Sequence, residues 1–328
     1  MAILVTGGAG YIGSHTVLFL KEHGEEVVVL DDLKKGHFEA LLGTKFYKGE
    51  LQNVATLDEI FQTNQIDSVM HFAASSLVGE SVERPLDYYE NNVIGTYHLL
   101  KKMIQYGVKR IVFSSTAATY GNPNKNPIEE DDPTNPANPY GETKLAIEHM
   151  LKWCDGAYGL KSVCLRYFNA AGADPEGRIG EDHNPETHLI PIVLQAALGQ
   201  REKVYIFGDD YPTEDGTCIR DYIHVLDLAA AHFLALKKLT NTNESAIYNL
   251  GNGSGFSVKQ VIDICRQVTG KKIKAEVAPK RVGDPAILIA SSEKANKDLG
   301  WVPKYTRLEE IVQHAWNWHQ HHPNGFGQ

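Results

Sequence analysis

A glycine-rich turn between a predicted strand and a predicted helix constrains the fold of this chain more than any other feature. Gly7, Gly10 and Gly13 have the spacing GxxGxxG, directly after the apolar run at 2–6 and at the start of a helical pattern over 12–24. Glycines in this context let the backbone turn tightly and let its N–H groups approach a pyrophosphate at the positive end of a helix. The motif therefore predicts the first β-α unit of a dinucleotide-binding fold.

The first half of the chain alternates between strand-like and helix-like segments. Apolar runs rich in β-branched residues lie at 25–32, 68–74, 110–115 and 161–169, and helical patterns such as 93–108 separate them. Repeated alternation of this kind implies parallel strands joined by right-handed crossovers. We predict an α/β fold with a doubly wound, Rossmann-type parallel sheet and a smaller mixed α/β carboxyl-terminal domain.

A segment rich in Gly, Pro and acidic residues, at 171–191, marks the change between the two predicted domains. The first domain is expected to cover 1–172, with 220–245 returning to it, and the second to cover 173–328. The second domain would lie over the carboxyl ends of the strands, which is where open α/β sheets bind ligands.

Composition excludes several classes of partner. The chain has 328 residues and a formal net charge of −9, which argues against nucleic acid or an anionic membrane as a partner. No apolar run approaches the length of a membrane span, and the amino terminus leads directly into a strand, which leaves no room for a signal peptide. Cys154, Cys164, Cys218 and Cys265 are scattered without a CxxC spacing. This pattern fits reduced thiols and predicts a cytoplasmic protein.

Two carboxylates end the second predicted strand. Asp31 lies 18 residues after Gly13, and Asp32 follows it. This is where a dinucleotide-binding fold places an acid that accepts hydrogen bonds from the adenosine ribose. A 2′-phosphate would meet two negative charges there, so we predict NAD rather than NADP. Lys34 and Lys35 are the only opposing signal.

Tyr140 and Lys144 are four residues apart behind Pro139, at a spacing that puts both side chains on one face of a helix. Alone, such a pair is most often part of a solvated surface. Beside a dinucleotide it has a chemical use. A free tyrosine, with a pKa near ~10, is a poor base, but an ammonium and an oxidised nicotinamide ring would both favour its phenolate. We therefore predict that Tyr140 is the base, and that Lys144 lowers its pKa and binds the nicotinamide ribose.

Several segments together resemble a known family over essentially the whole chain. GxxGxxG at 7–13, "HFAA" at 71–74, "NNVIGT" at 91–96, "FSST" at 113–116 and YxxxK at 140–144 resemble the extended short-chain dehydrogenase/reductases. "LRYFNAAG", "IFGDDYPTEDGTCIRDYIHVLDLA" and "YNLGNGSGFSV" are similar to the UDP-galactose 4-epimerase branch of that family. The resemblance implies reversible epimerisation of UDP-galactose and UDP-glucose at C4, through a 4-keto sugar and with retained NAD. It also implies a homodimer formed through helices at 93–106 and 141–157.

The resemblance assigns a role to each residue of the expected site. Thr116, Tyr140 and Lys144 are the implied catalytic residues, with the Thr116 hydroxyl bridging the sugar 4-oxygen and Tyr140. The implied cofactor contacts are Gly7, Gly10, Tyr11, Ile12, Gly13, Asp31, Asp32, Glu50, Leu51, Phe72, Ala73, Ala74, Asn92, Ser114, Tyr140, Lys144, Tyr167 and Phe168. The implied contacts with the UDP-sugar are Thr116, Tyr140, Phe168, Asn169, His188, Leu189, Val204, Tyr205, Phe207, Arg220, Tyr222, Arg281 and Asp284.

Four departures from the family pattern bear on binding. His188 stands where an asparagine is common, which leaves its side-chain contact open, and Ser76 stands where some relatives have a lysine that contacts the cofactor diphosphate. Glu50 replaces an aspartate that is often found near the adenine. Leu288 lies near the position that limits the room beside the sugar C2, and its size is intermediate between the residues found there.

Three alternatives remain beside the leading interpretation. An epimerase that prefers an N-acetylhexosamine or a pentose linked to UDP differs only in the sugar. A nucleotide-sugar 4,6-dehydratase would carry Asp-Glu after Thr116, where this chain has Ala117 and Ala118. A non-catalytic NAD-binding regulator would typically lack the Tyr-Lys pair.

We assign no residue to a metal site. The clustered histidines His319, His321 and His322 have no neighbouring Cys or acid to complete a ligand set, so a solvated helix end is expected. His71 lies on an apolar strand and is expected to pack in the core. The epimerase chemistry itself needs no metal.

Overall fold

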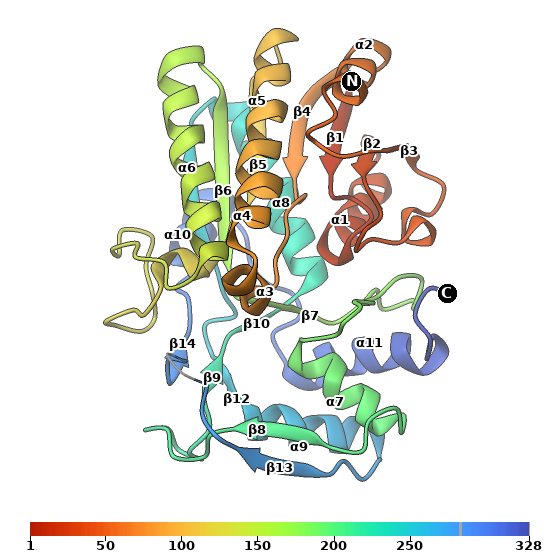
Figure 1. Ribbon diagram of the computed structural model, residues 1–328, viewed down its shortest axis with the longest axis vertical. Coiled ribbons are helices and arrows are strands. Elements are labelled where there is room, and N and C mark those ends of the chain that lie inside the picture. The colour runs from red at the N-terminus through yellow and green to blue at the C-terminus, as the bar shows by residue number, and fades with distance from the viewer. Residues whose placement is uncertain (282–283, 328) are drawn as a thin grey trace.

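A seven-stranded parallel sheet forms the centre of the computed structural model, which describes residues 1–281 and 284–327 (Figure 1). The strand order is β11-β6-β5-β4-β1-β2-β3, with every neighbouring pair parallel. This is the predicted Rossmann-type sheet. The strands are β1 (Ala2–Thr6), β2 (Glu26–Asp31), β3 (Lys45–Lys48), β4 (Ile66–His71), β5 (Arg110–Ser114), β6 (Lys161–Tyr167) and β11 (Ala246–Leu250).

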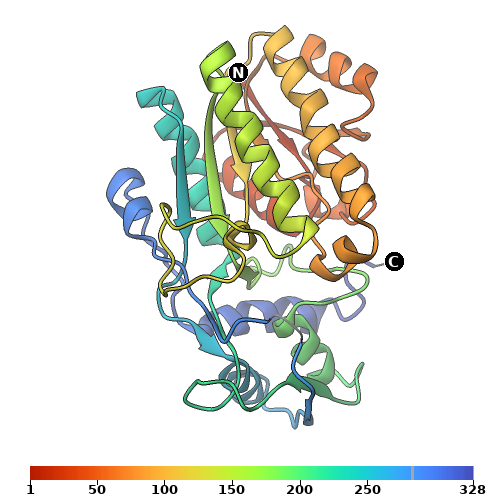
Figure 2. The same cartoon turned by 60° about the vertical axis from the view of Figure 1, so that its left-hand side comes forward.

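Helices cover both faces of the sheet, which explains why its inner strands are apolar at successive positions. Along β1, Ile3 and Val5 face one cluster of buried residues while Ala2 and Leu4 face the other. Helices α1 (Tyr11–Glu22) and α8 (Val225–Thr242) pack on the first face. On the second lie α2 (Val54–Thr63), α5 (Gly95–Gln105) and α6 (Pro139–Tyr158) (Figure 2).

Short helical elements lead into α5. After β4 the chain forms α3 (Val78–Glu83) and α4 (Pro85–Tyr88), and then the π-helical η2 (Tyr89–Ile94). Two 3₁₀ turns complete this lobe, η1 (Phe38–Leu41) after β2 and η3 (Ala117–Tyr120) after β5. A π-helical turn next to a regular helix is uncommon and frequently accompanies a functional site. Here it carries Asn92 into the loop that follows β4.

A second, smaller lobe lies beyond the carboxyl ends of the strands (Figure 1). Its core packs residues of α7 (Leu189–Ala197), α9 (Val258–Thr269) and α11 (Leu308–His321) against β8 (Val204–Phe207). Three small sheets support it, and they pair β8 with β13 (Ala275–Ala278), β9 (Ile219–Arg220) with β12 (Phe256–Ser257) and β14 (Ile287–Leu288), and β7 (Asn169–Ala171) with β10 (Tyr222–His224). The predicted mixed α/β carboxyl-terminal part is confirmed.

The chain returns to the first lobe after visiting the second. Besides α8, the strand β11 joins the sheet beside β6, and α10 (Glu293–Leu299) packs against β11 and α8. The returning segment is therefore longer than the 220–245 that the sequence suggested. The exact domain limits stay a prediction.

Two further observations concern the whole chain. Within residues 1–281 and 284–327, no helix is both long and apolar enough to span a membrane. All four cysteines belong to this described part, and none of them forms a disulfide.

Candidate active site

The glycine-rich turn brings three backbone segments closer together than any side chain would allow. Gly7 has φ +73°, and a Cβ on it would lie 2.5 Å from the backbone nitrogen of Ala73. A Cβ on Gly13 would lie 2.1 Å from the carbonyl oxygen of Gly7. Gly10 is the N-cap of α1, and among the described residues no side chain caps this helix. The first turn thus presents free N–H groups, which suits a pyrophosphate.

Acidic groups gather at the carboxyl end of β2, as predicted. The Asp31 carboxylate accepts hydrogen bonds from the N–H groups of Ala9 and Leu33, at 3.0 and 2.9 Å. Burial raises the pKa of this carboxyl, and the two N–H bonds oppose the rise. Lys34 lies 3.3 Å from Asp32 and 2.7 Å from Glu50. These acids therefore partly neutralise the charge of Lys34, which weakens one of the two lysine signals that had opposed NAD.

The Asn92 side chain fixes the loop after β4 by hydrogen bonds. This side chain is fully buried, accepts the N–H of Ser75 at 2.8 Å and donates to the Ser75 carbonyl and to Thr143, both at 3.1 Å. Phe72 and Ala73, in the same loop, donate their N–H groups to the Thr6 carbonyl. The structure thus ties the loop over the glycine-rich turn to α6, and Asn92 acts on the cofactor site through that loop.

The predicted base lies in the first turn of α6. Asn138 caps this helix by accepting the N–H of Gly141 at 2.9 Å, and Pro139 occupies the first helical position. Lys144, one turn after Tyr140, is buried, donates to the Ser114 carbonyl at 2.7 Å and lies 5.9 Å from the centre of the Tyr140 ring. Burial lowers the pKa of Lys144 to about 7, against the pull of Glu148.

The electrostatics of Tyr140 differ from the prediction. Burial raises the pKa of Tyr140, and the hydrogen bond with the Thr116 hydroxyl is the effect that lowers it. The expectation that the Lys144 ammonium lowers this pKa was wrong for the protein groups considered alone. Lys144 directs its charge at a carbonyl and is itself easily neutralised, so desolvation of the phenol dominates. Thr116 thus lies close enough to Tyr140 to affect its pKa, and the catalytic role of Thr116 stays a prediction.

A buried ion pair beneath this group was missed by the sequence analysis. Glu148, on α6 one turn after Lys144, pairs with Arg166 of β6, and both side chains are under 5% exposed. Glu148 also accepts the hydroxyl hydrogen of Ser115 at 2.5 Å. Ser115 precedes Thr116, so the pair fixes the loop that carries the catalytic hydroxyl. The available signal was the arginine inside an apolar strand, because buried charges need partners.

The remaining cofactor residues surround these groups. Tyr11 is buried and donates its hydroxyl to the Gly172 carbonyl at 2.6 Å, which links α1 to the crossover between lobes. The hydroxyls of Ser114 and Tyr167 lie 2.5 Å apart. Ile12 and Leu51 pack in the two sheet cores, and Ala74 lies partly buried in the loop after β4. Ser76, which stands where some relatives have a lysine, is exposed on that loop.

The predicted diphosphate and uracil contacts gather in the second lobe. Arg220 of β9 forms an ion pair with Asp284, and the Arg281 guanidinium lies 4.2 Å from the centre of the Phe207 ring. Residues 282 and 283 of the same motif lie outside the described residues. On β8, Val204 is buried in the core while Tyr205 is exposed.

The other predicted substrate residues differ from one another in their surroundings. Asn169 is partly buried and donates to the Asp221 carbonyl at 3.0 Å, and Leu189 begins α7. Tyr222 packs in the core of the second lobe, so the structure gives it a packing role, and its contact with substrate stays a prediction. His188 turns its Nδ1 toward Glu181, at 2.6 Å, rather than toward the catalytic residues.

Phe168 and Leu288 meet at the junction of the lobes. Both pack against one small cluster of buried residues formed by Ala117, Tyr120 and Ile128. Leu288 therefore lies close to the residues that follow Thr116, and its effect on the room around the sugar stays a prediction.

Comparison with known proteins assigns the class. Residues 3–251 match the NAD dependent epimerase/dehydratase family, and the chain belongs to that family. Within it, the chain is similar to UDP-glucose 4-epimerases. The one from Halalkalibacterium halodurans is 70% identical over 326 residues, which are 99% of this chain and 98% of that protein. The predicted resemblance is confirmed.

Solved structures agree with this assignment. A crystal structure of a UDP-glucose 4-epimerase matches with a TM-score of 0.99 and 59% identity, covering 100% of both chains. The UDP-glucose 4-epimerase from Bifidobacterium longum, solved in complex with NAD⁺ and UDP, matches with a TM-score of 0.95 and 38% identity over 99% of this chain and 100% of that one.

Proposed function

We propose that this enzyme interconverts UDP-galactose and UDP-glucose by inverting C4, with NAD as a retained cofactor. The observation that carries the proposal is the placement of Tyr140 and Lys144 side by side, with Thr116 next to Tyr140, in a lobe whose glycine-rich turn begins α1 with free N–H groups. The relatives that match over nearly the whole chain carry the same activity in their names.

The residues of the site divide the chemistry between them. The glycine-rich turn and the acids after β2 would hold NAD⁺, which would supply reversible hydride transfer at C4 of the sugar. Tyr140 takes the proton of the 4-hydroxyl, and Thr116 hydrogen-bonds to Tyr140 and orients that hydroxyl. Lys144 is buried and held by the Ser114 carbonyl, from where it positions the ribose beside Tyr140. Arg220 and Arg281 are suited to the diphosphate because a guanidinium pairs with two phosphate oxygens.

This chain does not fit what the competing activities require. A 4,6-dehydratase needs an acid and a base after Thr116, where Ala117 and Ala118 stand. A non-catalytic regulator has no use for a buried lysine beside a buried tyrosine. A preference for N-acetylated or pentose sugars depends on the room left by Leu288.

The first experiment is to follow conversion of UDP-galactose by purified protein with no NAD added. We expect UDP-glucose to form, because a closed hydride cycle consumes no cofactor. UDP-N-acetylgalactosamine, run in parallel at the same concentration, should be converted more slowly, since Leu288 packs against the cluster that follows Thr116 and would restrict the room for an N-acetyl group. Activity with neither sugar, even after NAD is supplied, would contradict the proposal.

We also propose that the enzyme is a cytoplasmic homodimer that pairs through α5 and α6. Large apolar side chains are exposed on these helices and on the turns before α5, including Ile94, Tyr97 and Trp153, and Trp153 is 75% exposed. Exposed apolar patches of this kind usually mark an interface. The unpaired cysteines support a reducing compartment.

The dimer predicts a mass by light scattering of about twice 36.4 kDa. Tyr97→Lys combined with Trp153→Lys should shift the protein toward the monomer, because two charges would enter an apolar interface. Lys48→Glu, at an exposed position at the end of β3, serves as the surface control. A wild-type mass of 36.4 kDa would count against the dimer.

A further inference from the structure

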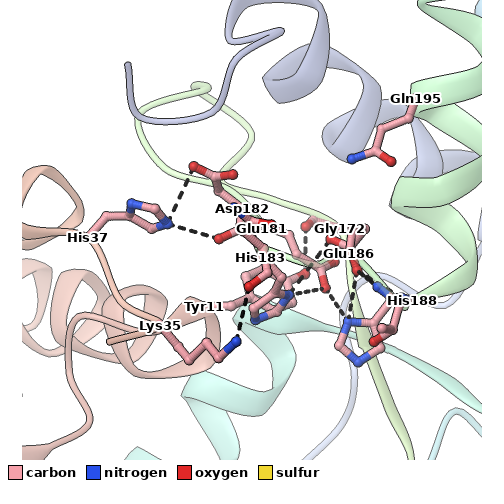
Figure 3. A network of polar contacts seen from close by, with 12 residues as sticks. Tyr11, Lys35, His37, Gly172, Glu181, Asp182, His183, Glu186, His188 and Gln195 are labelled. Carbon is pink, nitrogen blue, oxygen red and sulfur yellow. Dashed lines mark hydrogen bonds and ion pairs between the residues drawn. The ribbon is translucent and has the colours of Figure 1, made fainter. Parts of the chain in front are cut away.

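Four metal-ligating side chains converge in the loop that precedes α7 (Figure 3). Glu181, His183, Glu186 and His188 lie within eight residues of one another in the sequence, and each offers one nitrogen or oxygen atom to a common point. These four atoms all lie within 4.8 Å of one another. None of the four is one of the predicted catalytic residues Thr116, Tyr140 and Lys144.

The distances match those of a small coordination shell. Nδ1 of His188 lies 2.6 Å from Oε1 of Glu181 and 3.5 Å from Oε1 of Glu186. Nδ1 of His183 lies 3.1 Å from Oε1 of Glu181 and 3.8 Å from Oε2 of Glu186. In a tetrahedral site with bonds of about 2.0–2.2 Å, ligand atoms are about 3.3 Å apart. The four side chains therefore need only small movements to enclose an ion.

Burial makes it energetically costly to keep both carboxylates ionised unless a positive charge lies beside them. The side chains of Glu181 and Glu186 are 4% and 3% exposed, and two buried negative charges this close together need a positive partner. Glu186 is also fixed from outside the cluster, because its Oε1 accepts the N–H groups of Thr187 and His188 at 2.7 and 2.8 Å. Such bonds orient a ligating carboxylate and leave Oε2 for a cation.

The surrounding protein holds the loop in place on both sides of the cluster. Lys35 donates to the Asn184 carbonyl at 3.0 Å, and the His37 ring contacts the Asp182 carbonyl at 2.9 Å (Figure 3). The His183 ring packs edge-on against Tyr11, with ring centres 6.1 Å apart. The loop thus lies between the turn after β2, the start of α1 and the start of α7.

We propose that Glu181, His183, Glu186 and His188 bind one divalent transition metal ion, with Zn²⁺ as the favoured ion. Two imidazoles and two carboxylates are borderline donors that suit zinc, and a shell filled by four protein ligands is typical of structural zinc sites. The ion would take no part in the epimerase chemistry. It would fix the loop that ends at Leu189, where α7 begins.

The sequence analysis overlooked this cluster. Its glutamates and histidines lie in a segment whose Gly, Pro and acid content predicts only a crossover loop, and the sole histidine cluster considered was the one at 319–322.

A competing explanation of the cluster needs no metal. Burial would lower the pKa of His183 and His188, but their carboxylate partners raise the two values to about 9 and about 10. Two imidazolium groups could then balance the two carboxylates by themselves.

Zinc binding by the full-length enzyme distinguishes these accounts. The protein is treated with a chelator, freed of it, and dialysed to equilibrium against zinc chloride at neutral pH, and bound zinc is measured by atomic emission. We expect one zinc ion per chain. Glu181→Gln and His183→Ala should each weaken zinc binding by about tenfold or more. His321→Ala, which removes an exposed histidine outside the cluster, should bind zinc as wild type does.

A second measurement applies to the wild-type protein alone. Cobalt(II) in place of zinc should give the visible absorption of a tetrahedral site, and zinc should raise the thermal unfolding midpoint. Both effects should persist in His321→Ala. Wild-type protein that retains no zinc, or zinc binding that is equal in wild type, Glu181→Gln and His183→Ala, would overturn the proposal. If the two variants do not fold, the wild-type stoichiometry and cobalt spectrum decide the question.

Discussion

Tyr140→Phe is expected to lower kcat by about 100- to 10,000-fold, the range that removal of a general acid-base group produces. The substitution deletes one oxygen atom from a buried ring, so packing should change little. The proton of the sugar 4-hydroxyl then has no acceptor, and Thr116 loses its hydrogen-bond partner. NAD should stay bound, because the glycine-rich turn and the acids after β2 are untouched.

The measurement combines steady-state conversion of UDP-galactose with the NAD content of the purified variant. Tyr158→Phe is the matched control, since this tyrosine is exposed at the other end of the same helix. It should retain the wild-type rate. A Tyr140→Phe enzyme with wild-type turnover would refute the assignment of the base, whereas loss of NAD in that variant would show that the tyrosine also anchors the cofactor.

Acid should destabilise the fold below pH 6.5, because three histidines are buried in neutral form. Burial lowers the pKa of His71 to about 3 and the pKa of His15 and His232 to about 4. In the unfolded chain each titrates near ~6.5, so the unfolded state binds more protons as the pH falls. Stability conferred by the neutral forms is therefore present above pH ~6.5 and is lost as the pH falls toward the folded values.

Each buried histidine is expected to cause a sizeable loss of stability in acid. At pH 5 each of the three histidines lowers the free energy of unfolding by about 2 kcal/mol. Asp221 acts in the opposite sense, because burial raises its pKa to about 6 and the native state then gains a proton first; this offsets about 1 kcal/mol. His183 and His188 also oppose the loss, because their raised pKa values of about 9 and about 10 let the native state bind protons before the unfolded state does, and together they offset about 3 kcal/mol. A net loss of about 2 kcal/mol therefore remains.

Urea unfolding at pH 7.5 and pH 5 measures the loss directly. His232→Gln isolates one of the contributions, since the ring of His232 bonds only through Nδ1, to the Leu228 carbonyl at 2.8 Å. That variant should be less stable at pH 7.5 but lose about 2 kcal/mol less between the two pH values. Equal stability of the wild type at both pH values would show that the buried histidines are charged in the native state.

The inner strands of the sheet were predictable from the sequence, and two of the outer ones were not. β1, β4 and β5 lie between two layers of helices, so each contains consecutive buried apolar residues that stand out in the sequence, such as 2–5, 69–70 and 111–113. β3 is the edge strand Lys45–Lys48, which is short, polar at both ends and half solvated. β11 pairs with β6 across more than seventy intervening residues, and only the assembled fold reveals such a partner.

In the site, contacts within one helix were predictable from the sequence, and contacts between different elements were not. Tyr140 and Lys144 lie on one helix, so their spacing alone predicted that they share a face. Glu148 and Arg166 come from different elements, and so their pairing depends on how α6 packs on β6. The protein groups alone raise the pKa of Tyr140, because sequence gives the neighbouring charge but not the depth of burial. The predicted lowering of this pKa with NAD⁺ bound stays a prediction.

The late arrival of β11 has a consequence for how the protein is made. Until residue 250 leaves the ribosome, the growing sheet ends at β6, whose apolar edge has no partner. The entire segment between β6 and β11, which includes α7 and α8, must be synthesised first, and at about 5–20 residues per second the edge stays open for several seconds. An open apolar edge pairs readily with other chains. Chaperone capture of the nascent chain would therefore matter most in this interval, before the sheet can be completed.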